Sequence, residues 1–228
     1  MADPFPYRLY LVISAADCAG RDFVHVAEQA VLGGVDVVQL REKHAMPDEF
    51  LGKAERLQAM LQQYEVPLII NDNLDVAMHS NAFGIHVGRS DCSPAHIRSV
   101  WATCRSLGYS IEQLDQLQTE DARLSDCLGI SPVFKTPTKT DTVTEWGLDG
   151  IRTIRERTDK PLVAIGGINA ENAGDVIRAG ADCIAVVSAI CQAPDPQQAA
   201  REIRTQIDRA LYSAGGGYSA GNQPPAVY

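Results

Sequence analysis

The feature that most restricts the fold of this chain is a regular alternation of short apolar runs with longer segments of helical period. Short runs rich in β-branched residues are typical of buried strands, whereas apolar residues three or four apart are typical of helices. The apolar runs predict strands at 9–14, 35–40, 67–71, 84–87, 107–110, 127–130, 161–165 and 183–187. The other segments predict helices at 22–32, 47–64, 74–79, 94–104, 111–123, 147–158, 171–178 and 196–212. This pattern indicates a parallel sheet built from strand–helix units.

The number of units favours a closed barrel over an open sheet. An open doubly wound sheet usually has five or six strands, whereas eight strand–helix pairs in roughly 200 residues meet the minimum size of a (β/α)8 barrel. We therefore predict an α/β protein with a (β/α)8 TIM barrel as its single domain, covering residues 1–212. Residues 213–228 are rich in Gly, Ser, Ala and Pro and are predicted to form a flexible C-terminal tail.

The composition argues against several classes of partner. With 20 Lys and Arg against 29 Asp and Glu, the chain has a formal net charge of −9, which disfavours binding to nucleic acid. No uncharged apolar run approaches the ~18 residues of a membrane span, and the N-terminus lacks the pattern of a signal peptide. The six cysteines have neither metal-site nor redox-pair spacing, so we expect reduced, mostly buried thiols. These features predict a cytoplasmic protein that binds neither nucleic acid nor membranes.

Polar residues that follow the predicted strands are the candidates for a site, because barrel enzymes carry their active sites at the carboxyl ends of the strands. At the end of the second strand, Gln39, Arg41 and Lys43 share one face by the two-residue period of a strand. Two cations ~6–7 Å apart can hold both ends of a diphosphate, and Gln39, one step deeper, can offer its amide to a heteroaromatic ring. The alternative interpretation is a solvated charge run that leaves the strand.

Two acidic residues, Asp72 and Asp91, follow the third and fourth predicted strands. Carboxylate oxygens are ligands that Mg²⁺ prefers, and a pair of carboxylates leaves its other positions to phosphate and water. Asp is also common in turns and at helix caps, which is the alternative for both residues. The hypothesis of a magnesium site rests on their position opposite the cations.

The loops after the last three predicted strands have features of a second anion site. The first loop contains Thr136, Pro137, Thr138 and Lys139, a stiffened run of hydrogen-bond donors, although a Thr-rich surface loop is the alternative. Adjacent glycines follow the seventh strand, where loops of this architecture commonly hold phosphate through main-chain N–H groups and a helix N-terminus. Two separate anion sites imply two phosphorylated substrates.

Taken in order along the chain, these motifs resemble those of the thiamin phosphate synthase family. The matching segments are 39–43, 71–72, 84–88 with Asp91, 136–139 and 164–168, and the resemblance extends from about Leu9 to Arg204. In that family a (β/α)8 barrel joins hydroxymethylpyrimidine diphosphate to hydroxyethyl-methylthiazole phosphate, forming thiamin phosphate and releasing pyrophosphate. The resemblance therefore implies a transferase of thiamin biosynthesis that acts on two small molecules and uses Mg²⁺.

The resemblance also implies a role for individual residues. Asp72 and Asp91 would bind Mg²⁺, and Arg41, Lys43 and Lys139 would carry the catalytic positive charge. The residues implied to bind the pyrimidine diphosphate are Gln39, Leu40, Arg41, Glu42, Lys43, Asn71, Ser110 and Lys139. Those implied to bind the thiazole phosphate are Thr136, Pro137, Thr138, Gly167, Val187 and Ser188.

The chain departs from the family pattern at three positions. Glu112 stands where a His commonly follows the fifth strand, Ser131 replaces a usual Gly, and Asn73 stands where Arg is common. Because none of these belongs to the metal pair or to the cationic face, we expect activity with an altered affinity. Two other functions stay open, namely a thiazole tautomerase, which would rely on the missing His, and a catalytically silent barrel that binds thiamin precursors. A homo-oligomer is also compatible with the sequence.

Overall fold

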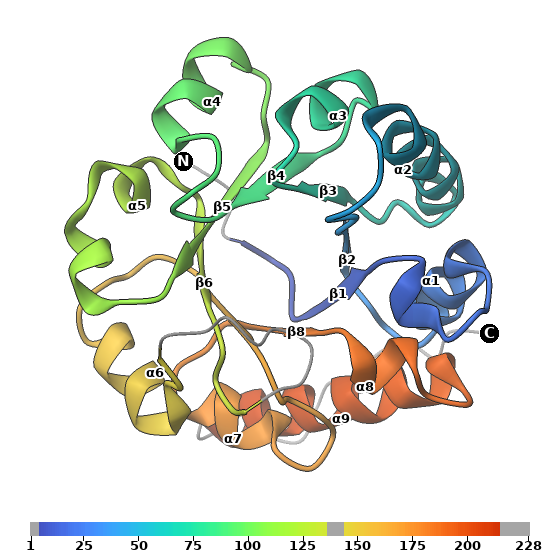
Figure 1. Ribbon diagram of the computed structural model, residues 1–228. Helices are drawn as coiled ribbons and strands as arrows, with labels where there is room; N and C mark the ends of the chain where they lie inside the picture. The colour runs from blue at the N-terminus through green and yellow to red at the C-terminus, as the bar shows by residue number, and fades with distance from the viewer. Residues whose placement is uncertain (1–4, 136–143, 215–228) are drawn as a thin grey trace.

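The protein is described by a computed structural model over residues 5–135 and 144–214. Its strands are β1 (Leu9–Ile13), β2 (Val37–Leu40), β3 (Leu68–Asn71), β4 (Gly84–Val87), β5 (Ser106–Ile111), β6 (Cys127–Ile130), β7 (Leu162–Ile165) and β8 (Cys183–Val186). All eight are parallel and pair in chain order, and β8 pairs with β1 to close the barrel (Figure 1). The predicted (β/α)8 architecture is confirmed.

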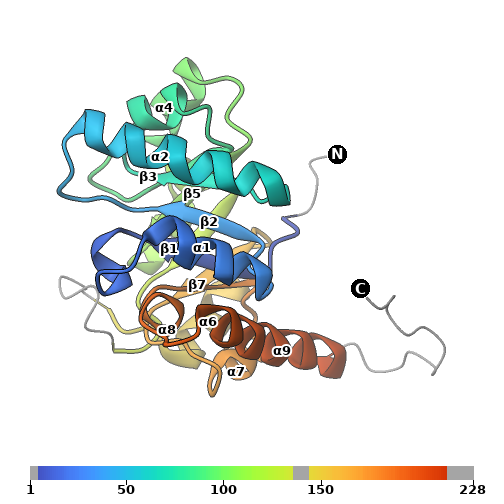
Figure 2. The ribbon, with the colours of Figure 1, turned by 90° about the vertical axis from the view of Figure 1, so that its right-hand side faces the viewer.

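Helices connect the strands and cover the outside of the barrel. The α-helices are α1 (Phe23–Leu32), α2 (Pro47–Leu61), α3 (Leu74–His79), α4 (Pro94–Val100), α5 (Glu120–Leu124), α6 (Gly147–Arg155), α7 (Ala173–Arg178), α8 (Ser188–Cys191) and α9 (Pro196–Ala214). Figure 2 shows α1, α2 and α9 running along the outside of the strands. Pro47 and Pro94 begin α2 and α4, at a position where the missing N–H is not needed by the helix. In the described ranges, no helix has both the length and the apolar character of a membrane span.

Short 3-10 helices complete the element order: η1 (Ala16–Cys18), η2 (Gln62–Tyr64) and η3 (Leu114–Gln118). The sequence prediction of a single helix over 111–123 is wrong. Ile111 is the last residue of β5, and the chain then forms η3 and α5, which are separated at Thr119. Thr119 has an extended backbone, and its Oγ1 accepts a hydrogen bond from the N–H of Ala122, so it caps a new helix. The sequence also misses η1 and α8, because elements this short show no periodicity.

Side chains inside the barrel differ in kind along its axis. One set of them forms a small apolar core, which consists of Tyr10, Val12, Val37, Ile69, Cys127, Val163, Cys183 and Ala185. A larger apolar core, which includes Leu11, Leu40 and Ile70, fills the space between the strands and the surrounding helices. Toward the carboxyl ends the interior becomes polar, with Gln39 and Asn71 facing inward from β2 and β3. The apolar core therefore forms the base of a polar cavity.

Three aspartates at the amino ends of β2, β6 and β8 stabilise the opposite face of the barrel. Asp36 accepts a hydrogen bond from the N–H of Leu9 at 3.0 Å and forms an ion pair with Arg204 of α9 at 2.9 Å. Asp126 accepts a hydrogen bond from the N–H of Leu107 on β5 and forms an ion pair with Arg98 of α4. Asp182 likewise accepts from the N–H of Leu162 on β7 and pairs with Arg155 of α6. Each carboxylate thus joins a strand to a helix at the face away from the cavity.

Candidate functional site

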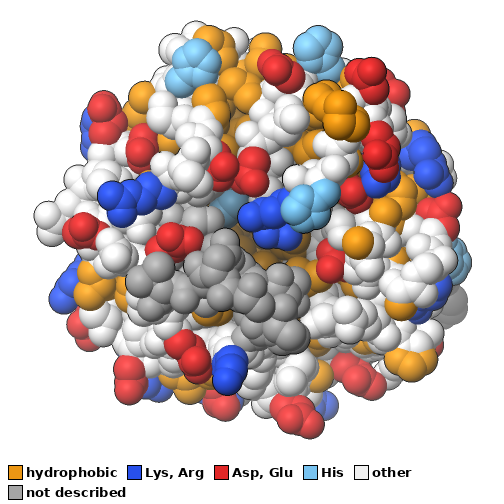
Figure 3. Space-filling model, viewed as in Figure 1, with side chains coloured by type: hydrophobic (Ala, Val, Ile, Leu, Met, Phe, Trp, Pro, Cys, Tyr) orange, Lys and Arg blue, Asp and Glu red, His pale blue; other side chains and the backbone are white. Residues whose placement is uncertain are grey.

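A cavity of about 820 Å³ opens at the carboxyl ends of the strands. In Figure 3 basic, acidic and histidine side chains surround a hollow near the centre of this face. The predicted site residues that line the cavity are Gln39, Arg41, Lys43, Asn71, Asp72, Asp91, Ser110, Gly167, Val187 and Ser188. The closed barrel therefore brings together residues that are far apart in the sequence. The predicted Thr136, Pro137, Thr138 and Lys139 lie outside the described residues.

The end of β2 forms the cationic wall of the cavity. Gln39, Arg41 and Lys43 line the cavity, as the two-residue period predicts. Leu40 is fully buried on the other face of the strand. Glu42 also points away, because its carboxylate accepts a hydrogen bond from the N–H of Ala15 and pairs with Lys53 at 2.8 Å. The side chains of Leu40 and Glu42, which the resemblance includes in the binding segment, therefore do not line the cavity.

The acidic pair lies beside this cationic wall. Burial raises the pKa of the Asp72 carboxyl to about 6, the charge of Asp91 and a hydrogen bond with it add to the effect, and Lys43 and Arg41 oppose it. Asp91 is held in turn by the N–H of Gly88, which donates to its Oδ2 at 2.8 Å. Asp72 has a positive φ of 61°, a costly conformation for a residue with a side chain, of the kind that clusters at functional sites. The structure thus brings the two carboxyl groups together at the cavity.

The chemistry of these donors fits a magnesium ion. Carboxylate oxygens are hard ligands, and the pair is close enough for one carboxyl group to suppress ionisation of the other. Within the ranges that the structure covers, no cluster of three or more His, Cys, Asp or Glu side chains has the geometry of a metal site. An ion held here by Asp72 and Asp91 would therefore take its other oxygens from a ligand and from water.

Asp72 is not engaged in capping the helix that follows it. Asn73, and not Asp72, is the N-cap of α3, and its side chain accepts a hydrogen bond from the N–H of Val76 at 2.9 Å. The alternative interpretation of Asp72 as a helix cap is therefore wrong. The other two departures, Glu112 and Ser131, both line the cavity.

The opposite wall is formed by the ends of β7 and β8. Gly167, Val187 and Ser188 line it, and Ser188 begins the short helix α8. Gly166 has a φ of +110°, and a Cβ atom there would lie 2.6 Å from Cβ of Pro132. The glycine is therefore required by the close approach of the loop after β6 as well as by its own backbone. Through these three described residues the wall presents small side chains, main-chain groups and a hydroxyl, in contrast to the charged side chains of the β2 wall.

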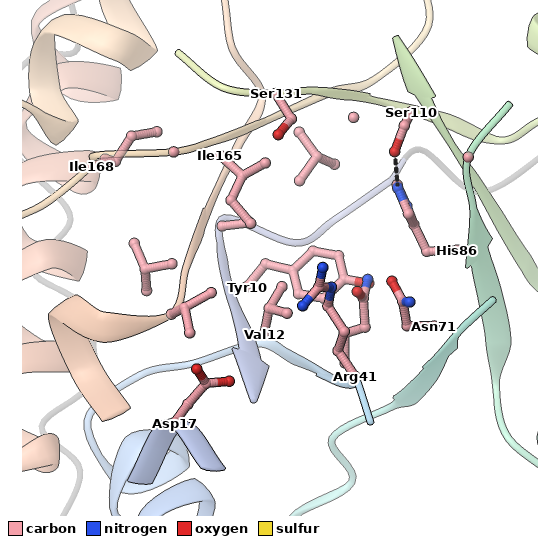
Figure 4. Close-up of a pocket in the computed structure, with 18 of the residues that line it drawn as sticks. Tyr10, Val12, Asp17, Arg41, Asn71, His86, Ser110, Ser131, Ile165 and Ile168 are labelled. Carbon is pink, nitrogen blue, oxygen red and sulfur yellow. Dashed lines mark hydrogen bonds between the residues drawn. The ribbon is translucent and has the colours of Figure 1, made fainter. Parts of the chain in front are cut away.

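Sequence reasoning assigns no role to His86, although the structure places it in the cavity. Its Nε2 lies 2.9 Å from Oγ of Ser110, and Figure 4 shows the imidazole directed at that hydroxyl. The ring occupies space beside Gly108 and Gly129, where a Cβ would lie 2.3 Å and 2.9 Å from its atoms. The two-residue period of β4 could have indicated that the side chain of His86 faces the inside of the barrel. The two glycines that make room for its ring lie on β5 and β6, so the sequence of β4 alone does not reveal them.

A second unpredicted residue is Tyr10, on the inner face of β1. Its hydroxyl oxygen accepts a hydrogen bond from Nε2 of Gln39 at 2.9 Å, and both side chains are buried. Burial raises the pKa of the Tyr10 hydroxyl well above its ordinary value, so it stays protonated at neutral pH. Asp17 of η1 also lines the cavity (Figure 4). Its carboxylate accepts a hydrogen bond from the hydroxyl of Ser14 at 2.6 Å.

Comparison with known families and sequences gives a consistent result. Residues 9–190 match the family model described as thiamine monophosphate synthase. The thiamine-phosphate synthase of Albidiferax ferrireducens is 46% identical over 201 residues, which are 88% of this chain and 92% of that protein. The thiamine-phosphate synthase of Chloroflexus aurantiacus is 44% identical over 201 residues, covering 88% and 93% of the two chains.

Solved structures agree with the sequence comparison. A thiamine phosphate pyrophosphorylase from Pyrococcus furiosus superposes with a TM-score of 0.81 at 29% identity, covering 90% of this chain and 98% of the other. A 3-hexulose-6-phosphate synthase superposes with a TM-score of 0.64 at 17% identity, covering 88% of this chain and 99% of the other. This second likeness is one of fold alone.

Proposed function

The chain belongs to the thiamine monophosphate synthase family, and from this premise we propose how its cavity carries out the transferase reaction. The substrates are hydroxymethylpyrimidine diphosphate and hydroxyethyl-methylthiazole phosphate, and the products are thiamin phosphate and pyrophosphate. The observation that carries the proposal is that one cavity holds Arg41, Lys43, Asp72 and Asp91 on one side and Gly167 on the other. A charged site for a diphosphate and an uncharged site for a phosphate are thus joined in one space.

The pyrimidine diphosphate binds at the β2 wall. Arg41 and Lys43 neutralise the diphosphate, Gln39 and Asn71 contact the ring from deeper in the cavity, and Ser110 donates its hydroxyl to the diphosphate. A magnesium ion, when bound by Asp72 and Asp91, supplies further positive charge to the phosphate oxygens. Lys139 adds a third cation from the loop after β6, a role that rests on the family resemblance.

The thiazole phosphate binds at the β7–β8 wall. Its phosphate meets main-chain N–H groups near Gly167, Val187 and Ser188, an arrangement that many barrels use for phosphate. Thr136, Pro137 and Thr138 contribute further donors, again on the family resemblance. The two walls hold the thiazole nitrogen and the reactive methylene carbon of the pyrimidine facing each other across the cavity.

The reaction is a dissociative substitution. The bond between the methylene carbon and the diphosphate oxygen breaks first, and its electron pair leaves with the pyrophosphate. The aminopyrimidine ring delocalises the positive charge of the methylene group, and the lone pair of the thiazole nitrogen then forms the new carbon–nitrogen bond. This reaction requires no nucleophile from the chain. It positions the two reactants and stabilises the negative charge that develops on the leaving group through Arg41, Lys43 and Lys139.

The experiment that tests the function mixes the purified protein with both phosphorylated precursors and Mg²⁺ and measures thiamin phosphate by chromatography, with and without a chelator. Formation of thiamin phosphate that stops on chelation supports the proposal. Conversion of the thiazole phosphate to a tautomer, without pyrimidine diphosphate or Mg²⁺, would instead identify a tautomerase. Tight binding of precursors by calorimetry without any product would identify a non-catalytic binding protein.

The cysteines support a reducing compartment, and we propose the cytoplasm as the place where the protein acts. All six are free thiols, and five of them are buried. Two further points stay predictions. One is the division of the chain into a barrel over residues 1–212 and a tail over residues 213–228, and the other is the formation of a homo-oligomer.

A further inference from the structure

The carboxylate of Asp17 lines the cavity but has no role in the proposed reaction. Figure 4 shows its side chain extending from η1 toward the space that the barrel encloses. We propose that Asp17 is a further catalytic residue, which contacts the thiazole ring and stabilises the positive charge that forms on the thiazole nitrogen. This inference rests on the proposed function, because it uses the thiazole phosphate site at the β7–β8 wall.

The fold places Asp17 between the two substrate walls. β1 pairs with β2 on one side and with β8 on the other, so the residues that follow β1 lie between the ends of those strands. On the β2 side, the carbonyl oxygen of Ile13 accepts a hydrogen bond from the N–H of Arg41 at 2.9 Å. On the β8 side, η1 contacts α8, the helix that begins at Ser188. We therefore expect a thiazole ring that reaches from its phosphate site toward the pyrimidine to lie beside Asp17.

Hydrogen bonds on both sides of η1 fix the position of Asp17. The hydroxyl of Ser14 donates to Oδ2 of Asp17 at 2.6 Å, and its oxygen accepts from the Asp17 N–H at 3.2 Å. Arg21 joins η1 to the end of α8, because its guanidinium donates to the carbonyl oxygens of Cys18 at 3.2 Å and Ala193 at 2.8 Å. A group held in this way can stabilise a charge without first rearranging when the charge appears.

The Asp17 carboxylate is available to a positively charged ligand. Over residues 5–135 and 144–214 it forms no ion pair, although Arg41 lines the same cavity. The other two aspartates of the cavity, Asp72 and Asp91, lie close to each other and are assigned to the metal. Asp17 is also partly buried, and a charge that is partly shielded from water interacts more strongly with a nearby cation than one in bulk solvent.

The proposed reaction produces a cation at this place. Before the carbon–nitrogen bond forms, the thiazole nitrogen carries a lone pair and no charge. When the lone pair bonds to the methylene group, the positive charge passes from that group to the thiazole ring, and the product is a thiazolium. No proton is transferred in this step. A carboxylate beside the ring attracts the charge as it develops, so Asp17 stabilises the transition state more than the neutral thiazole.

The first part of the test isolates the charge with two probes. One is hydroxyethyl-methylthiazole phosphate, and the other is its N-methyl thiazolium derivative, which carries a positive charge on the reacting nitrogen. Calorimetry with Mg²⁺ and pyrophosphate measures the affinity of wild type and Asp17→Asn for each probe. The ratio of the cation's affinity to the neutral probe's affinity should fall roughly tenfold in Asp17→Asn. Asn keeps the size of the side chain and an oxygen that can accept the Ser14 hydrogen bond, so only the charge is lost.

Steady-state kinetics with both substrates give the catalytic part of the test. In Asp17→Asn, kcat/KM for the thiazole phosphate should fall roughly tenfold. Asp115 offers a matched control, because it lies in the first turn of η3 as Asp17 lies in the first turn of η1, but it does not line the cavity. Asp115→Asn should equal wild type in both measurements. Equal losses in the two variants would assign the effect to the 3-10 helix and overturn the inference.

The outcomes separate the inference from the function on which it rests. If wild type forms thiamin phosphate but Asp17→Asn keeps the wild-type ratio or the wild-type kcat/KM, the inference is wrong and the proposed function stands. If folded wild type forms no thiamin phosphate, both are wrong. Should Asp17→Asn fail to fold, a crystal structure of wild type with the N-methyl probe gives a second measurement. A carboxylate of Asp17 within about 6 Å of the thiazolium ring would support the inference, and a longer distance would overturn it.

Discussion

The Nε2 atom of His86 lies 2.9 Å from the Oγ atom of Ser110, across the interior of the barrel between β4 and β5. The contact exists because Gly108 and Gly129, on β5 and β6, leave the volume that the imidazole occupies. Ser110 is proposed to contact the diphosphate, and its position thus depends on residues of the three adjacent strands β4, β5 and β6.

Gly129→Ala should disturb this contact and slow the reaction. The added Cβ would lie 2.9 Å from Cε1 of His86, so the ring must move and carry Ser110 out of place. We expect kcat/KM to fall roughly tenfold, because small displacements of positioning groups have large effects on rate. Gly52→Ala is the matched control, since nothing lies within 4 Å of its Cβ, and it should leave turnover unchanged. Steady-state kinetics of both variants decide the matter, and equal kcat/KM values would contradict the prediction.

Asp72→Asn should lower activity far more than stability. Loss of a charged contact to the metal and the leaving group is expected to reduce turnover by about a hundredfold or more. The fold should tolerate the change, because the substitution also removes the repulsion between Asp72 and Asp91. Asp75→Asn serves as the control, because Asp75 is an exposed residue in the first turn of α3, three positions after Asp72. This variant should be fully active. Near-normal turnover of Asp72→Asn at limiting Mg²⁺ would rule out the assigned role.

The pKa of about 6 for Asp72 predicts a pH dependence of stability in the presence of a chelator. The folded chain holds this proton more tightly than the unfolded chain, where the pKa is 3.8. Its contribution to the free energy of unfolding is therefore complete below pH 3.8 and is lost as the pH rises through 6. The loss should be on the order of 1–2 kcal/mol. Urea denaturation between pH 4.5 and 7.5 measures it as a difference between wild type and Asp72→Asn, and parallel curves would refute the assignment.

Asp36→Ala should produce the opposite pattern, with stability lost and the catalytic site intact. The change leaves the N–H groups of Arg8 and Leu9 without their acceptor and removes one of the two carboxylate partners of Arg204, at the seam between β1 and α9. We expect a decrease of about 2–3 kcal/mol in the free energy of unfolding, as is usual for the loss of a part-buried hydrogen-bonded pair. At temperatures well below unfolding, kcat should equal that of wild type. A large fall in kcat without a fall in stability would show that this face influences the reaction.

Thiol reagents should modify Cys92 before any other cysteine. Cys92 is partly exposed, whereas the other five are buried. Partial burial and the charges of Asp75 and Asp91 raise the pKa of the Cys92 thiol, so its labelling should be slow at neutral pH and faster in alkali. Mass spectrometry of the native protein after a short exposure identifies the modified residue, and fast labelling of Cys127, whose pKa burial raises to about 12, would contradict the structure.

The sequence by itself determined the architecture and most of the cavity wall. Eight apolar runs separated by helical segments specify eight buried strands, because strand and helix periods are local properties of the chain. The two-residue period also places Gln39, Arg41 and Lys43 on one face, and each of them does line the cavity. Local capping chemistry was harder to read, since only the structure shows that Asn73 caps α3 and leaves Asp72 to the cavity.

Only the tertiary structure decided which inward-facing residues touch each other. The contacts of Tyr10 with Gln39 and of His86 with Ser110 join different strands, and their geometry depends on the register and closure of the whole barrel. The same holds for the pKa of Asp72, which is raised by burial and by a carboxylate from the next strand's loop. Periodicity assigns a residue to a face, but distance, burial and electrostatics are properties of the space that the folded strands enclose.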